Sequence, residues 1–148
     1  MSDIVIRPVA STERKQWEPL WRGYLAFYEK SVPEAVTDFT WTRLIDPRDP
    51  IEGLIAWDGG QALGLVQYFL HPSTWNMGGN VYLQDLFVVP EARGKRIGRR
   101  LIAAVTAASK AKGAGVLYWQ TEEFNGTARR LYERVAKRAP FVRYNIEL

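Results

Sequence analysis

Two hydrophobic periods run along this chain, and together they predict an ordered series of helices and strands. Apolar side chains such as Trp17, Leu20 and Trp21 recur every three or four positions, which is the spacing of one helical face. This period predicts helices over 12–30, 34–44, 97–112 and 125–137. Alternating or continuous apolar runs bounded by turn residues predict strands over 4–8, 51–57, 62–71, 81–89, 116–121 and 141–148.

The order of these elements predicts one mixed α/β domain that spans residues 1–148. A strand is followed by two helices and three strands, and then by a helix, a strand, a helix and a closing strand. Asp58-Gly59-Gly60, between the second and third strands, is a strong hairpin signal. The sequence shows no repeat, low-complexity tract or linker at which a second domain would begin.

Composition narrows the class of protein. Among the 148 residues, 47% are hydrophobic and 13% aromatic, which indicates a globular chain. The absence of cysteine excludes a disulfide framework, a thiolate metal site and a cysteine nucleophile. The sequence has no His/Cys/Asp cluster, so it does not indicate a metal site. No apolar run has the length of a membrane span, and the opening residues MSDIVIRPV lack the pattern of a signal peptide. We therefore expect a cytoplasmic protein without a membrane segment.

The positive excess behind the net charge of +4 is concentrated at residues 93–100, where the 81–89 strand turns into the next helix, and at residues 129–138 on a late helix. A strand that passes through a glycine-containing turn into a helix presents free backbone N–H groups and the positive end of the helix dipole. Cationic side chains gather at the same turn, so the pattern predicts a cradle for a polyvalent anion such as a pyrophosphate. The basic residues are Arg93, Lys95, Arg96, Arg99 and Arg100.

The turn resembles the acetyl-coenzyme A signature of the GNAT superfamily of N-acetyltransferases, Q/R-x-x-G-x-G/A. Arg93 matches its first position, Ile97 the apolar position at the helix entry and Gly98 its last position. Arg96 stands where the family usually has its middle glycine. We expect the arginine to be accommodated with a negative φ, because the family uses the N–H group of this residue. The resemblance implies a largely antiparallel sheet flanked by helices, with the fourth and fifth strands splayed where the cofactor inserts.

A second stretch resembles another GNAT signature, Asn-x6-Tyr. Read without the resemblance, Asn125 is the cap of an amphipathic helix and Tyr132 a half-buried residue on its apolar face. The resemblance implies that the Asn125 side chain binds the pantetheine region and that Tyr132 is the general acid for the leaving thiolate. A hydroxyl with an ordinary pKa near 10 suits a thiolate of comparable basicity.

The central strand supplies the remaining cofactor contacts that the resemblance implies. Its backbone at residues 86–89 would lie beside the pantetheine as an extra strand would, and the N–H group of Phe87 or Val88 would polarise the thioester carbonyl. These positions also read simply as core residues of a buried strand, and both readings can hold together. The expected cofactor-binding residues are Leu86, Phe87, Val88, Val89, Arg93, Gly94, Lys95, Arg96, Ile97, Gly98, Arg99 and Asn125.

The acceptor side contains carboxylates but no obvious base. Diamine acetyltransferases share the Tyr-Leu-acid-acid pattern and place a glutamate where this chain has Gln84, which cannot be a base. Asp85 is expected on the opposite strand face, between Leu83 and Phe87, where a carboxylate is costly without a partner. We carry Asp85 as the second catalytic candidate, with two readings open: a hydrogen-bonded structural acid, or a site that holds a cationic substrate.

Three residues are expected to contact the acceptor amine. Gln84 and Glu122 lie at or just after the two splayed strands, and Glu122 or its neighbour Glu123 could act through water. In this family the first two helices form a wall of the acceptor pocket, which adds Tyr28.

The phrases around these motifs look most like the yeast N-acetyltransferases that acetylate histones, polyamines and D-amino acids. The resemblance implies direct acetyl transfer from acetyl-CoA, in a ternary complex, to an amine of a small molecule or basic peptide. It also implies a homodimer in which C-terminal strands meet. Two alternatives remain: a GNAT fold that binds coenzyme A without catalysis, and a nonenzymatic nucleic-acid binder with salt-dependent phosphate contacts. Against the second, the cations surround one helix N-terminus and no nucleic-acid-binding signature accompanies them, so we expect no stable nucleic-acid partner.

Overall fold

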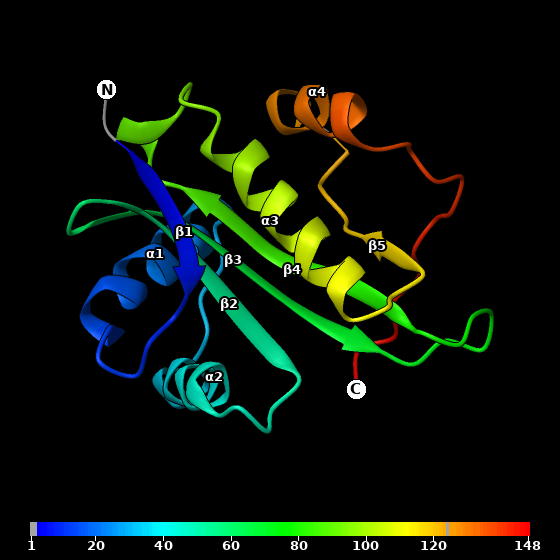
Figure 1. Cartoon of the computed structure of the whole chain (residues 1–148), viewed down its shortest axis with the longest axis horizontal. Coiled ribbons are helices and arrows are strands. Elements are labelled where there is room, and N and C mark those ends of the chain that lie inside the picture. The colour runs from blue at the N-terminus through cyan, green and yellow to red at the C-terminus, as the bar shows by residue number, and fades with distance from the viewer. Residues whose placement is uncertain (1–2, 124) are drawn as a thin grey trace.

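The computed structural model describes residues 3–123 and 125–148, which form a five-stranded sheet with helices on both faces (Figure 1). In chain order the elements are β1 (Ile4–Pro8), α1 (Arg14–Phe27), α2 (Glu34–Ile45), β2 (Ile51–Asp58), β3 (Gln61–His71), β4 (Asn80–Val88), the short 3-10 helix η1 (Pro90–Ala92), α3 (Ile97–Ala111), β5 (Val116–Tyr118) and α4 (Gly126–Val135). The element types and their order agree with the sequence prediction as far as α4. No helix in these described ranges is long and apolar enough to cross a membrane.

The sheet has the strand order β1-β2-β3-β4-β5. The first four strands pair antiparallel with their neighbours, and β5 joins β4 in parallel. The predicted hairpin joins β2 to β3, and Gly59 has the positive φ of 58° that such a tight turn requires. A mixed, largely antiparallel sheet is thus confirmed.

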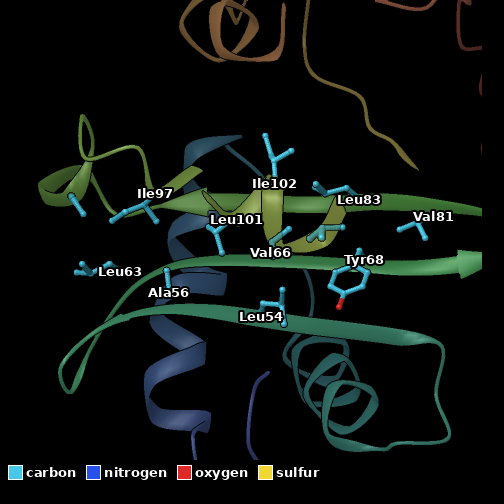
Figure 2. Packing of buried hydrophobic residues seen from close by; sticks show 12 residues of the cluster. Leu54, Ala56, Leu63, Val66, Tyr68, Val81, Leu83, Ile97, Leu101 and Ile102 are labelled. Carbon is cyan, nitrogen blue, oxygen red and sulfur yellow. The ribbon is translucent and has the colours of Figure 1, made fainter. Parts of the chain in front are cut away.

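One face of the sheet is covered by α3, whose apolar stripe of Ile97, Leu101 and Val105 is fully buried (Figure 2). The helix approaches β3 closely at Gly64, where an added Cβ would lie 3.1 Å from Leu101 Cδ1 and 3.2 Å from Ile97 Cγ2. This close packing fixes the position of the N-terminus of α3 relative to β3 and β4.

The opposite face is covered by α1 and α2 through an aromatic cluster. Trp17 stacks on Trp21 with ring centroids 5.9 Å apart. Trp41 of α2 packs against the indole of Trp17. Burial of such large rings is worth roughly 2–3 kcal/mol each, so this cluster anchors α1 beside β3 and β4. The helical spacing in the sequence correctly placed Trp17 and Trp21 on one buried helix face.

A β-bulge in β4 changes the path of the sheet. Gln67 of β3 pairs with Asp85, but the next residue, Tyr68, pairs with Leu83, which leaves Gln84 without a partner. Bulges bend a strand and increase its twist. On the other side β5 pairs only with the first three residues of β4, from Asn80 to Tyr82. Beyond Tyr82 the two strands separate, which confirms the predicted splaying of strands four and five.

Two sequence predictions are wrong at the end of the chain. The strand expected over 116–121 ends at Tyr118, because β4 diverges and no neighbouring backbone remains for residues 119–121 to pair with. The closing strand expected over 141–148 does not form, and the segment has no regular structure. Its alternating pattern is compatible with a strand, but the segment pairs with no strand of the described sheet. Its apolar side chains are therefore exposed: Phe141, Val142, Tyr144, Ile146 and Leu148.

Candidate active site

The separation of β4 from β5 opens a cleft of about 320 Å³ in the middle of the sheet. Both splayed strands, α1, α4 and the C-terminal segment contribute to its walls. The lining residues are Tyr24, Tyr28, Tyr82, Leu83, Gln84, Leu86, Trp119, Gln120, Thr121, Glu122, Tyr132 and Arg143. A second hollow of about 450 Å³, towards α1, shares Tyr24, Tyr28 and Glu122 with the first and adds Asp85. Through these shared residues the two hollows form one cleft, the candidate acceptor cleft.

The N-terminus of α3 has free N–H groups at the turn where the sequence predicts an anion cradle. The N–H group of Arg100 is the first to find a backbone acceptor, the carbonyl of Arg96. None of the N–H groups of residues 94–99 donates to an acceptor within the described chain. Helix N-termini with free N–H groups and a positive dipole end bind phosphate groups readily. The cradle therefore has the donors that a pyrophosphate requires.

The basic side chains around this cradle divide into two groups. Lys95, Arg96 and Arg99 are exposed and form no salt bridge with the described carboxylates. Arg100 instead donates from Nη2 to the carbonyl of Ile4, 2.8 Å away, and so ties α3 to β1. Three cations thus remain available to an anion at the turn.

The backbone of Arg96 differs from the sequence expectation. Its φ is 61°, a left-handed conformation, where a negative value was expected. Gly94, two residues earlier, has a φ of 86°. A left-handed conformation costs a residue with a side chain roughly 1–2 kcal/mol. The turn therefore has the shape that suits the glycine usual at this position, and Arg96 adopts it under strain.

Arg93 lies between the cradle and the acceptor cleft. Its Nε donates to the carbonyl of Val88, 3.2 Å away, at the end of β4. Its guanidinium group lies 5.4 Å from the ring centroid of Phe27 and 5.9 Å from that of Phe87. Its charge is thus placed beside the strand that the sequence assigns to pantetheine binding.

Tyr132 projects from α4 into the cleft and packs edge-on against Trp119, with ring centroids 5.5 Å apart. Burial raises the pKa of its hydroxyl to about 12, with a smaller contribution from Tyr28. The hydroxyl is therefore protonated across the physiological range, as a proton donor must be. The N-cap position predicted for Asn125 is confirmed, because its Oδ1 accepts from the N–H group of Ala128 at 3.4 Å.

Asp85 lies on the α1 face of the sheet, where it is held by a hydrogen-bonded chain. Trp17 Nε1 donates to Gln67 Oε1 at 2.9 Å, and Gln67 Nε2 donates to Asp85 Oδ2 at 2.7 Å. Burial raises the pKa of the Asp85 carboxyl, while hydrogen bonds from Gln67 and Tyr24 act in the opposite direction. A carboxyl that is held in place and has a raised pKa suits either of the two roles left open by the sequence.

The surroundings expected for Asp85 are only partly correct. Phe87 belongs to the cluster beneath α1, but Leu83 belongs to the cluster beneath α3, on the opposite face. The bulge at Gln84 breaks the simple alternation of β4, so Leu83 and Asp85 no longer share a face. Sequence reasoning missed this because a bulge leaves no residue signature here.

The three predicted acceptor contacts all line the cleft, Gln84 at the bulge, Glu122 after β5 and Tyr28 at the end of α1. Burial raises the pKa of Tyr28, and a hydrogen bond with Thr121 partly offsets this.

Tyr24 and Arg143 also line the cleft but were not predicted as site residues. The sequence places Tyr24 only within the predicted 12–30 helix, and it predicts a strand for the segment that contains Arg143. The described residues contain no cluster of His, Cys, Asp or Glu side chains that could hold a metal ion.

Comparison with known proteins places these features in context. The acetyltransferase (GNAT) family profile matches residues 15–136. The D-amino-acid N-acetyltransferase HPA3 of Saccharomyces cerevisiae is 34% identical over 143 residues, covering 95% of this chain and 89% of the yeast protein. An uncharacterized N-acetyltransferase of Bacillus subtilis, YhfO, is 35% identical over 130 residues, covering 87% and 86%.

Among solved structures, the aminoglycoside acetyltransferase AAC(6')-Iy in complex with a CoA-containing bisubstrate analog superposes with a TM-score of 0.80. It shares 20% sequence identity, and the match covers 98% of this chain and all of that chain.

Proposed function

The chain belongs to the acetyltransferase (GNAT) family and is an acetyltransferase, and we propose that it moves the acetyl group of acetyl-CoA directly to a primary amine. The acceptor is an amine of a small molecule or of a basic peptide. One observation carries the proposal: an unpaired edge of β4 leads from the N–H cradle of α3 to the cleft that contains Tyr132. N–H groups for the pyrophosphate, an extended backbone edge for the pantetheine and a proton donor for the thiolate thus follow one another in the order that acetyl-CoA requires.

In this proposal the cradle of residues 94–99 binds the pyrophosphate of acetyl-CoA, with charge supplied by Lys95, Arg96 and Arg99. The β4 backbone at 86–89 holds the pantetheine, as a strand would pair with it. Binding at this edge replaces the bond that Arg93 makes to the Val88 carbonyl. The CoA-containing analog bound to AAC(6')-Iy supports the choice of cosubstrate.

The chemistry is an attack of the amine nitrogen on the thioester carbonyl carbon. The new C–N bond forms while the C–S bond breaks, and the sulfur takes the proton of the Tyr132 hydroxyl. The second proton that the nitrogen releases returns through water to the Tyr132 oxygen, so that the hydroxyl is restored. The amine must first lose a proton from its cationic form. Asp85 and Glu122 border the cleft on the amine side, and we assign Asp85 the primary role of attracting the ammonium group and accepting its proton through water. Gln84, which cannot accept a proton, contributes a hydrogen bond to the acceptor.

The exposed C-terminal segment supports a homodimer. Its five apolar side chains alternate in a strand pattern and are each more than 75% exposed: Phe141, Val142, Tyr144, Ile146 and Leu148. Val116 and Tyr118 of β5 also expose apolar surface. Pairing of this segment with a second copy in the cytoplasm would cover both surfaces.

The decisive experiment is a calorimetric titration of acetyl-CoA into the protein, with duplex DNA as the comparison. The proposal expects one acetyl-CoA bound per chain at micromolar concentration, and only weak, salt-sensitive binding of DNA. A thiol-release assay over a panel of amines then separates an active enzyme from a coenzyme A-binding module without catalysis. Absence of acetyl-CoA binding would contradict the proposal.

A further inference from the structure

A cation without an anionic partner borders the acceptor cleft. The Arg143 guanidinium donates from Nη1 to Gln120 Oε1 at 2.6 Å and from Nε to Asn145 Oδ1 at 2.8 Å. It also lies close enough to the Tyr82 hydroxyl to form a hydrogen bond. All three partners are neutral, and no described carboxylate lies within salt-bridge distance of this side chain. Its charge is therefore uncompensated but its orientation is held.

Six other arginines of the described chain are used differently, because each is paired with a carboxylate. Arg14, Arg22 and Arg43, for example, each form a salt bridge with a carboxylate 2.5–3.0 Å away. A guanidinium group held by amide side chains at the wall of a cleft instead keeps N–H donors and a full charge for a ligand. Planar, bidentate recognition of a carboxylate is the interaction that such a group makes best.

Carboxylates also line this cleft. Asp85 borders the hollow towards α1 together with Lys30, Arg143 borders the hollow between the splayed strands, and Glu122 borders both. A ligand that places an ammonium group near the carboxylates and a carboxylate at Arg143 would satisfy both regions. A polyamine would instead bring a second positive charge towards Arg143, which is unfavourable.

We propose that the acceptor is an amino acid or a similar amino-carboxylate, and that Arg143 binds its carboxylate. This inference rests on the proposed function and narrows its acceptor class. Gln120 and Asn145 hold the guanidinium group in place, so little side-chain freedom is lost on binding. Lys30 is the other cation that lines the cleft, but the described side-chain hydrogen bonds that hold Arg143 have no counterpart at Lys30.

The test compares acceptors that differ only in the carboxylate. Alanine, phenylalanine and lysine of both hands are assayed against their amides by thiol release, with the wild type and Arg143→Gln. We expect the wild type to prefer each acid form of its accepted amino acids by at least about tenfold in kcat/KM. Arg143→Gln should remove that preference by lowering kcat/KM for the acid, with a change of less than about twofold for the amide.

Two further variants serve as controls. Arg138→Gln removes a cation just before the C-terminal segment and outside the cleft lining, and it should leave the preference unchanged. Lys30→Gln tests the competing cation and should also leave it unchanged. The KM for acetyl-CoA should stay within about twofold of the wild-type value in all three variants.

Several results would overturn the assignment. Equal losses for acids and amides in Arg143→Gln would show that Arg143 only supports the C-terminal segment. A wild-type preference for amides, or loss of the acid preference in Lys30→Gln alone, would also contradict it. Acetyl-CoA binding without acetylation of any amine would instead contradict the proposed function itself, and this result is distinct from a selective failure at Arg143.

Discussion

Removal of one hydroxyl group, in Tyr132→Phe, tests the proposed proton donor with little change in packing. The phenyl ring keeps the edge-on contact with Trp119, in which the ring centroids are 5.5 Å apart. The Tyr132 hydroxyl makes no hydrogen bond to another described residue. The free energy of unfolding should therefore change by less than about 0.5 kcal/mol.

The pKa of Tyr132 sets the size of the kinetic effect. Burial raises this pKa to about 12, above that of an ordinary tyrosine. A positioned general acid contributes about 10²–10⁴ to a rate, and the contribution falls when its pKa lies far from the optimum. The raised pKa places the contribution of Tyr132 towards the lower end of this range. We expect kcat to fall about 100-fold, which is about 2.7 kcal/mol of transition-state stabilisation.

The assay is steady-state release of free coenzyme A thiol, with the KM for acetyl-CoA measured in parallel. That KM should stay within about twofold of the wild-type value, because Tyr132 belongs neither to the cradle nor to β4. Tyr68→Phe is the matched control: burial also raises the pKa of Tyr68 to about 12, but Tyr68 lies in the core beneath α3. It should leave kcat unchanged within about twofold.

Two results would refute the reasoning. An unchanged kcat in Tyr132→Phe would remove this residue from the mechanism. The raised pKa also means that Tyr132 stays protonated as the pH rises from 8 to 10. A fall in wild-type kcat with a midpoint near pH 10 that disappears in Tyr132→Phe would show that the hydroxyl is not desolvated.

Three further substitutions test the cradle and the acceptor side. Gly98→Glu should abolish acetyl-CoA binding in calorimetry by adding bulk and charge at the helix N-terminus. In the control Gly98→Ala, the added Cβ would make an ordinary 3.7 Å contact with Leu131. This variant should stay folded and bind acetyl-CoA more tightly than the Glu variant. Arg96→Gly should raise the free energy of unfolding in urea by about 0.5 kcal/mol, because relief of the left-handed strain exceeds the entropy cost of glycine. Lys95→Gly removes the same charge at a residue without positive φ, and it should lower the free energy of unfolding. Asp85→Asn should lower kcat/KM for the amine about tenfold or more. Because burial raises the pKa of Asp85 in the folded state, the wild type loses stability as pH rises through that pKa. The Asn variant should therefore be more stable than the wild type at pH 7–8, by a margin that shrinks towards pH 4; a margin that grows on acidification would contradict the raised pKa.

Much of the fold followed from local patterns, because those patterns depend on neighbours close in sequence. Helical spacing placed the Trp17 and Trp21 face of α1 in the core, and the Asp-Gly-Gly turn defined the β2–β3 hairpin. The N-cap at Asn125 followed from residue type and position. The turn at 93–98 likewise predicted a basic helix N-terminus with free N–H groups, since a helix N-terminus is a local feature.

The tertiary structure decided what depends on neighbours distant in sequence. The bulge at Gln84 arises from the register between β3 and β4, and it places Leu83 and Asp85 on opposite faces. The missing strand at 141–148 has the correct alternation, but a strand needs a paired edge that only another segment can supply. The position of Arg143 beside Gln120, 23 residues earlier, follows from the path of that unpaired segment. The sequence alone thus determined most of the elements and the helix N-terminus at which the anion cradle is proposed, and long-range pairing determined the shape and charge of the acceptor cleft.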